Sequence, residues 1–167
     1  MKQVELGEAM KEGMRRLASG VSVVACLDDD RQPCAMTATS ITSVSDSPAS
    51  LLVCINQQTL MYKTLKAEKP RSFSVNLLAA QHEEVSNRCA SGDQGASRMS
   101  VGDWNLDGVA PVLEDGLASF ICQVDQWVDY GTHGIVIAQI ETVLVNEESD
   151  IDPLLYLNGS YGHFSTK

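Results

Sequence analysis

The 167-residue sequence has few of the features that cross-link small proteins or direct them into membranes. Its five cysteines are scattered and form no Cys-x-x-Cys pair, which argues against a disulfide framework and a structural zinc site. The longest apolar runs, Leu51–Ile55 and Ile135–Ala138, are too short to cross a bilayer. Met1–Glu5 lacks the apolar core of a signal peptide. We therefore expect a cytoplasmic protein with reduced thiols and no membrane partner.

Positive charge is also scarce. Twelve Lys and Arg stand against 22 Asp and Glu, giving a formal net charge of −10. A nucleic-acid-binding protein needs the opposite field, so no nucleic acid is expected as a partner. A phosphate-bearing ligand would have to be held by local donors.

Several common motifs are missing. There is no Gly-x-Gly-x-x-Gly, no P-loop and no Gly-x-Ser-x-Gly. The sequence therefore does not support a standard dinucleotide-binding protein, nucleotide-binding protein or hydrolase. The histidines His82, His133 and His163 do not pair with carboxylates at helical spacing, and no metal site is predicted.

Apolar periodicity predicts more strands than helices, without regular alternation between them. The predicted helices are 6–17, Thr59–Glu68 and Gln81–Ala90, and the predicted strands are Val21–Leu27, Pro33–Ala38, Ser50–Asn56, Ser72–Leu78, Leu117–Asp129 and Gly134–Asn146. Ser50–Asn56 is apolar on both faces, which favours a central position, and the polar stretch Ser91–Asp107 is expected to be a mobile loop. This order favours a mainly β fold, an antiparallel β-barrel with peripheral helices, formed by residues 1–167 as a single domain.

The stretch Met36–Ser45 carries six hydroxyls in ten residues, at the point where a predicted strand leaves the sheet. Threonine suits strands and serine suits loops, so ordinary turn chemistry explains this density. Alternatively, small side chains let backbone N–H groups and hydroxyls reach the polar edge of a planar heterocycle such as a flavin.

A second candidate element, Cys54–Thr59, joins an apolar strand to a short helix. Asn56 or Thr59 could simply cap that helix. The same geometry could offer free N–H groups to a phosphate.

Together these segments resemble the flavin reductase-like family, the FMN-binding split-barrel reductases that serve two-component flavin-dependent monooxygenases. The resemblance runs from about Met10 to Tyr161 and is carried, in order, by 14–24, 36–40, 42–45, 51–56, 73–78, 131–133 and 153–156. It implies a split barrel, a homodimer, bound FMN or FAD, and NADH or NADPH as reductant. It also implies a partner monooxygenase that receives the reduced flavin.

The resemblance assigns roles by position. Thr37, Ala38, Thr39 and Ser40 would face the isoalloxazine edge, while Cys54, Ile55, Asn56 and Thr59 would hold the ribityl chain and phosphate. Ala90 and Arg98 would complete the flavin site, Arg98 near the phosphate, and His133 would lie beside the nicotinamide as the catalytic residue. Tyr161 either closes the pocket or packs the barrel, and His133 could equally be a solvated turn residue.

The chain departs from the family at two positions. Cys89 precedes Ala90 where the family often has an aromatic residue, and Met99 follows Arg98 where it often has Phe. Both changes remove a ring close to the expected flavin and leave its identity open. A flavin-binding electron carrier or sensor without reductase activity, and a barrel that has lost its cofactor, are the alternative interpretations.

Overall fold

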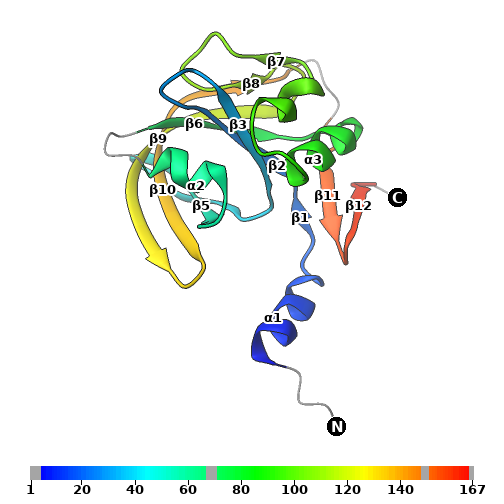
Figure 1. Cartoon of the computed structure of the whole chain (residues 1–167). Coiled ribbons are helices and arrows are strands. Elements are labelled where there is room, and N and C mark those ends of the chain that lie inside the picture. The colour runs from blue at the N-terminus through cyan, green and yellow to red at the C-terminus, as the bar shows by residue number, and fades with distance from the viewer. Residues whose placement is uncertain (1–4, 67–70, 148–150, 166–167) are drawn as a thin grey trace.

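The computed structural model describes residues 5–66, 71–147 and 151–165 (Figure 1). Residues 1–4 of the segment Met1–Glu5 and residues 67–68 of the predicted helix Thr59–Glu68 lie outside this range. The helices are α1 (Leu6–Met14), α2 (Leu60–Leu65) and α3 (Glu83–Ala90), with 3-10 turns η1 (Ala80–His82) and η2 (Ala96–Ser100). The strands are β1 (Ser19–Gly20), β2 (Ser22–Leu27), β3 (Pro33–Ala38), β4 (Ile41–Asp46), β5 (Ala49–Asn56), β6 (Ser72–Leu77), β7 (Trp104–Asn105), β8 (Val112–Leu113), β9 (Ala118–Tyr130), β10 (His133–Val145), β11 (Leu154–Leu157) and β12 (Ser160–His163).

The principal sheet has seven strands in the order β3-β2-β6-β9-β10-β5-β4. Two small sheets, β1-β11-β12 and β7-β8, flank it. Every pairing between these strands is antiparallel, so the predicted mainly β, split-barrel type of fold is confirmed. In Figure 1 the β9–β10 hairpin extends from the body of the molecule, with α2 beside it.

The strand β2 separates two hydrophobic cores, which explains why all six of its residues are buried. Val24 and Cys26 face the first core, between the principal sheet strands and α2. Val23 and Ala25 face the second core, under α3 and β11. Successive side chains of a strand point to opposite faces, so an uninterrupted apolar run marks a strand covered on both sides.

The composition of β5 favours a central position, but the strand is not central. It lies between β10 and the edge strand β4. Leu51, Val53 and Ile55 are buried in the first core. Leu52 and Cys54, on the other face, are only half-buried. Both faces of β5 are apolar, although the chain covers only one of them. The apolar uncovered face is the reason why the predicted central position was wrong.

Two connections are more regular than expected. The hydroxyl-rich stretch leaves β3 after Ala38 as expected, but after only two residues it forms β4, which pairs with β5 at the opposite edge of the sheet. Within Ser91–Asp107 the chain forms η2 and β7, and Trp104 Nε1 donates a hydrogen bond to the Val101 carbonyl at 2.8 Å. Side-chain to backbone bonds therefore order this polar segment.

Helix α1 ends at Met14, earlier than the apolar spacing through Leu17 predicts. None of its residues is buried, and it projects from the body in Figure 1. Among the described residues, no helix has the length and apolar character needed to cross a membrane.

Candidate functional site

The predicted ring-edge residues lie at the end of β3 and in the connection to β4. Thr37 Oγ1 donates to the Ser86 carbonyl of α3 at 2.6 Å, and Ala38 is buried in the first core. Thr39 and Ser40 are exposed. Thr39 and Ser40 can therefore offer side chains to a ligand, whereas Ala38 can offer only its backbone.

The exposed hydroxyl of Ser40 joins this connection to β5. Ser40 Oγ accepts from Cys54 N–H at 3.3 Å and donates to the Cys54 carbonyl at 3.2 Å. The hydroxyl thus continues the ladder at the point where β4 begins. This contact brings two segments of the predicted flavin site together.

The end of β5 and the start of α2 form a capped turn. Thr59 Oγ1 accepts from Tyr62 N–H at 3.1 Å, and Asn56 Oδ1 accepts from Gln58 N–H at 2.9 Å. The capping interpretation is therefore what the structure shows, and a phosphate role for this turn stays a prediction. Ile55 is fully buried and faces the first core, away from Asn56.

His133 opens β10 and pairs directly with Asn56 of β5. Directly opposed residues of antiparallel strands point to the same face, so these two side chains share one face of the sheet. His133 Nδ1 lies 2.9 Å from Thr132 Oγ1, and the His133 carbonyl accepts from Gln57 Nε2 at 3.2 Å. The structure thus brings the predicted nicotinamide-side residue next to the predicted phosphate end.

Arg98 is buried, with 6 % of its surface exposed, and its guanidinium already has partners. It donates to the carbonyls of Ala35, Asp93 and Ser91 at 2.7, 2.9 and 3.2 Å. Burial lowers the pKa of Arg98 from its ordinary value. In this arrangement Arg98 fastens the 91–98 segment to β3, so a contact with phosphate requires a change in these bonds.

The same segment reaches the start of α2, because Gln94 Oε1 accepts from Leu60 N–H at 2.6 Å. Ala90, the last residue of α3, is exposed just before this segment. The segment that carries Ala90 and Arg98 is thus hydrogen-bonded to the start of the helix that Thr59 caps.

Tyr161 packs against the second core and meets the end of β3 through Ser86. Its hydroxyl is 2.8 Å from Ser86 Oγ, and its ring makes an edge contact with Tyr156 at 5.3 Å. The packing role considered for Tyr161 is therefore present. Pocket closure stays a prediction.

Sequence reasoning missed four residues that tie these segments together: Gln57, Ser86, Gln94 and Thr132. Each acts through a hydrogen bond to a segment distant in sequence or to a turn neighbour. No local motif indicates such contacts. Only the Gln57-Gln58 pair, directly after Asn56, could have drawn attention to Gln57.

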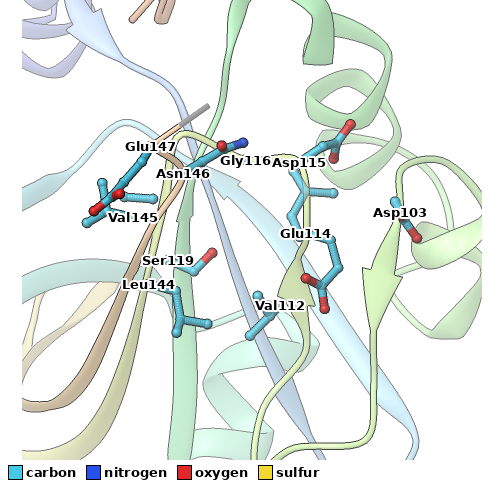
Figure 2. Close-up of a pocket in the computed structure, with 12 residues that line it drawn as sticks. Asp103, Val112, Glu114, Asp115, Gly116, Ser119, Leu144, Val145, Asn146 and Glu147 are labelled. Carbon is cyan, nitrogen blue, oxygen red and sulfur yellow. The ribbon is translucent and has the colours of Figure 1, made fainter. Parts of the chain in front are cut away.

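Two hollows in the surface differ in charge. A groove of about 590 Å³ lies between α1 and the Thr39–Thr42 connection. Lys11 and Arg15 line it, and no carboxylate does so among the described residues. Figure 2 shows the other hollow, a cavity of about 640 Å³ lined by Asp103, Glu114, Asp115 and Glu147.

The groove fits an anionic, partly apolar ligand and the cavity does not. The groove offers hydroxyls of Thr39, Ser40 and Thr42 on one side and apolar side chains of α1 on the other. The carboxylates of Figure 2 would repel a phosphate at close range. A flavin, which joins an apolar ring system to a phosphate, therefore fits the residues of the groove and the neighbouring turn.

Comparison with known proteins agrees with a flavin as the ligand. Residues 14–165 match the family model described as flavin reductase like domain. The chain is 36% identical over 152 residues to the FMN reductase (NADH) RutF of Agrobacterium fabrum, covering 90% of this chain and 84% of the relative. It is 31% identical to the 4-hydroxyphenylacetate 3-monooxygenase reductase component of Pseudomonas aeruginosa, covering 92% of this chain and 89% of the relative.

A solved structure shares the arrangement of nearly all of the chain. BorF, the flavin reductase component of a bacterial two-component tryptophan halogenase, superposes with a TM-score of 0.83 at 28% identity. The match covers 96% of this chain and 99% of BorF.

Proposed function

The chain belongs to the flavin reductase like domain family, and on that premise we propose that it is an NAD(P)H:flavin oxidoreductase that reduces FMN or FAD. The observation that carries the proposal is the groove beside Thr39 and Ser40, which has cationic and hydroxyl groups in a protein of net charge −10. Close relatives are named NADH-dependent FMN reductases or monooxygenase reductase components.

The work of the protein in such a reaction is positioning. A bound flavin would accept hydride from the nicotinamide when the two rings stack with reacting atoms about 3–3.5 Å apart. Thr39 holds a hydroxyl donor at the groove, whereas the Ser40 hydroxyl is bonded to Cys54, and Asn56 and Thr59 form the capped turn at the end of β5. His133, opposite Asn56, would orient the nicotinamide. Hydride transfer between the two rings requires no general base.

The test is steady-state oxidation of NADH and NADPH with FMN and FAD, in all four combinations. We expect turnover that depends on added flavin. A folded protein that oxidises neither nicotinamide with either flavin excludes the proposal. A yellow protein that binds flavin tightly yet barely oxidises NAD(P)H supports the carrier or sensor alternative instead.

We further propose a homodimer, formed through the face of the sheet that this chain leaves open. Leu52 pairs with Ile137, and Ile135 pairs with Val128, so these side chains share one face. Leu52, Ile135 and Ile137 are half-buried, Val128 is 53 % exposed, and none belongs to either core. A second copy would cover this face. Sedimentation equilibrium of the wild type and of Ile137→Glu tests this, with a monomeric wild type excluding it.

The reduced flavin would leave to a flavin-dependent monooxygenase, in keeping with relatives named as reductase components. We propose a cytoplasmic location for this exchange and treat residues 1–167 as one domain, supported by the family match over 14–165. Mixing the protein with a candidate oxygenase and following NADH-dependent hydroxylation would identify the partner.

A further inference from the structure

Gly134, next to His133, lies against the indole of Trp127 with no space for a side chain. A Cβ at this position would lie 2.7 Å from Trp127 Cζ2, 2.8 Å from Nε1 and 2.9 Å from Cε2. Real Cβ atoms do not approach other atoms so closely, so an alanine here must displace the ring. Glycine is therefore needed at this position for close packing of the ring.

The indole is held in place by polar and aromatic contacts. Trp127 Nε1 donates to Asp129 Oδ1 at 2.8 Å. Its ring meets Tyr62 of α2 edge-on, with centroids 5.2 Å apart and planes at 74°. Tyr62 Oη donates to the same Asp129 oxygen at 2.9 Å. The hairpin and α2 are thus joined through one carboxylate.

Lys66, just past the end of α2, completes this group. Its ammonium is ion-paired with Asp129 Oδ2 and donates to Tyr62 Oη at 2.7 Å. It also lies over the rings of Tyr62 and Trp127, 5.1 and 5.9 Å from their centroids. We call Tyr62, Lys66, Trp127 and Asp129 the tip cluster.

The tip cluster connects the two ends of the proposed site. On one side, α2 starts at the Thr59 cap that follows Asn56. On the other side, Asp129 pairs with Gly134, whose neighbour His133 pairs with Asn56. A shift of Trp127 would move the hairpin end relative to α2, and with it the distance from His133 to the Asn56–Thr59 turn.

We propose that Trp127, seated on Gly134 and bonded to Asp129, is a positioning residue that sets where His133 meets the nicotinamide. The inference rests on the proposed function. It adds that nicotinamide use depends on the tip cluster, although none of its members is assigned to the flavin or the nicotinamide.

The first experiment compares Gly134→Ala with Gly20→Ala. Gly20 is a matched control, because it lies in strand β1 with no atom within 4 Å of an added Cβ. We expect the KM for NADH of Gly134→Ala to rise about tenfold in the FMN-dependent assay, since small misplacements are costly. Flavin affinity, from quenching of flavin fluorescence, should stay within about twofold. Gly20→Ala should match the wild type in both.

A second pair of variants covers the case in which Gly134→Ala does not fold. Trp127→Phe keeps a ring but loses the N–H, and Asp129→Asn keeps the size but loses the ion pair. We expect a rise of about threefold in the KM for NADH for each, below that of the glycine variant. Thermal melting curves recorded alongside separate this effect from loss of folded protein.

The outcomes are distinct. A folded Gly134→Ala or Asp129→Asn with wild-type KM for NADH overturns the inference. So does a proportional loss of flavin affinity and NADH use, because that pattern marks a purely structural role. A wild type without flavin-dependent NADH oxidation overturns the proposed function, and this inference with it.

Discussion

The groove beside Thr39 and the cavity of Figure 2 are nearly equal in volume, about 590 and 640 Å³, yet opposite in charge. Lys11 and Arg15 line the groove, although both are partly neutralised, Lys11 by an ion pair with Glu8 at 2.8 Å and Arg15 by one with Glu12 at 3.9 Å. Only carboxylates supply charge in the cavity among its described lining residues. Size therefore does not distinguish a ligand site from a surface hollow in this molecule, whereas the charge of the lining does.

The cavity is also separated from His133 along the β9–β10 hairpin. The cavity lies where β9 starts and β10 ends, and His133 is at the other end of the same hairpin. Twelve residues of strand span roughly 40 Å, so the acidic surface hardly acts on a ligand near His133 at physiological ionic strength. A strongly acidic protein can thus hold a phosphate-bearing ligand.

The largest expected effect comes from making the groove resemble the cavity. Thr39→Glu places a carboxylate among the hydroxyls of the groove. We expect the apparent Kd for FMN to rise at least about 30-fold, because a like charge near an anionic ligand costs on the order of 2 kcal/mol when partly desolvated. Fluorescence titration measures it, with Thr39→Gln as the control of similar size. Equal affinities for the two variants would remove the charge argument.

The next effect concerns His133, which pairs with Asn56 at the end of the sheet. His133→Ala should lower kcat/KM for NADH about tenfold, as expected for loss of one hydrogen bond of about 1.4 kcal/mol. FMN affinity should be retained. If both parameters stay at wild-type values, His133 is a solvated turn residue.

A smaller effect concerns Asp129, the carboxylate of the tip cluster. Hydrogen bonds from Lys66, then Trp127, lower the pKa of Asp129 below its ordinary value. Its contribution to stability is therefore present above the unfolded pKa of about 3.9 and is lost as pH falls through the lower folded value. Between pH 5 and pH 3 we expect the Tm of the wild type to fall about 2 °C further than that of Asp129→Asn. Parallel melting curves of the two proteins would contradict this.

The smallest effect is expected at the cavity itself. Glu147→Gln removes one of its charges without touching the groove. KM values for FMN and NADH should stay within about twofold of wild type, because Glu147 does not line the groove and its exposed charge is screened by water and salt. A marked change would show that the cavity takes part in ligand binding.

Sequence patterns located most of the principal sheet. The strand Pro33–Ala38 was predicted with the bounds that the structure has, and β2, β6 and the long hairpin differ by a residue or so at each end. The strands β4 and β11 were not predicted. Ile41–Asp46 has a strand pattern weakened by serines, and the pairing with β5 that makes it a strand is not visible locally.

For the candidate site, the sequence indicated which segments matter but not how they meet. The neighbourhood of Asn56 and His133 depends on the register between β5 and β10, which no local motif specifies. The burial of Arg98 was hidden for the same reason, since its partners are main-chain carbonyls. Such contacts depend on where the backbone passes and leave no mark on residue type.

The chain has two tryptophans, and each belongs to a different end of the molecule. Trp127 lies in the tip cluster, whereas Trp104 is in β7, one residue after Asp103 of the acidic cavity. A Trp104→Phe protein would therefore emit tryptophan fluorescence from the tip alone. The fluorescence of Trp127 would then report directly on the packing of its indole against Gly134, and it could be followed during turnover without an added label.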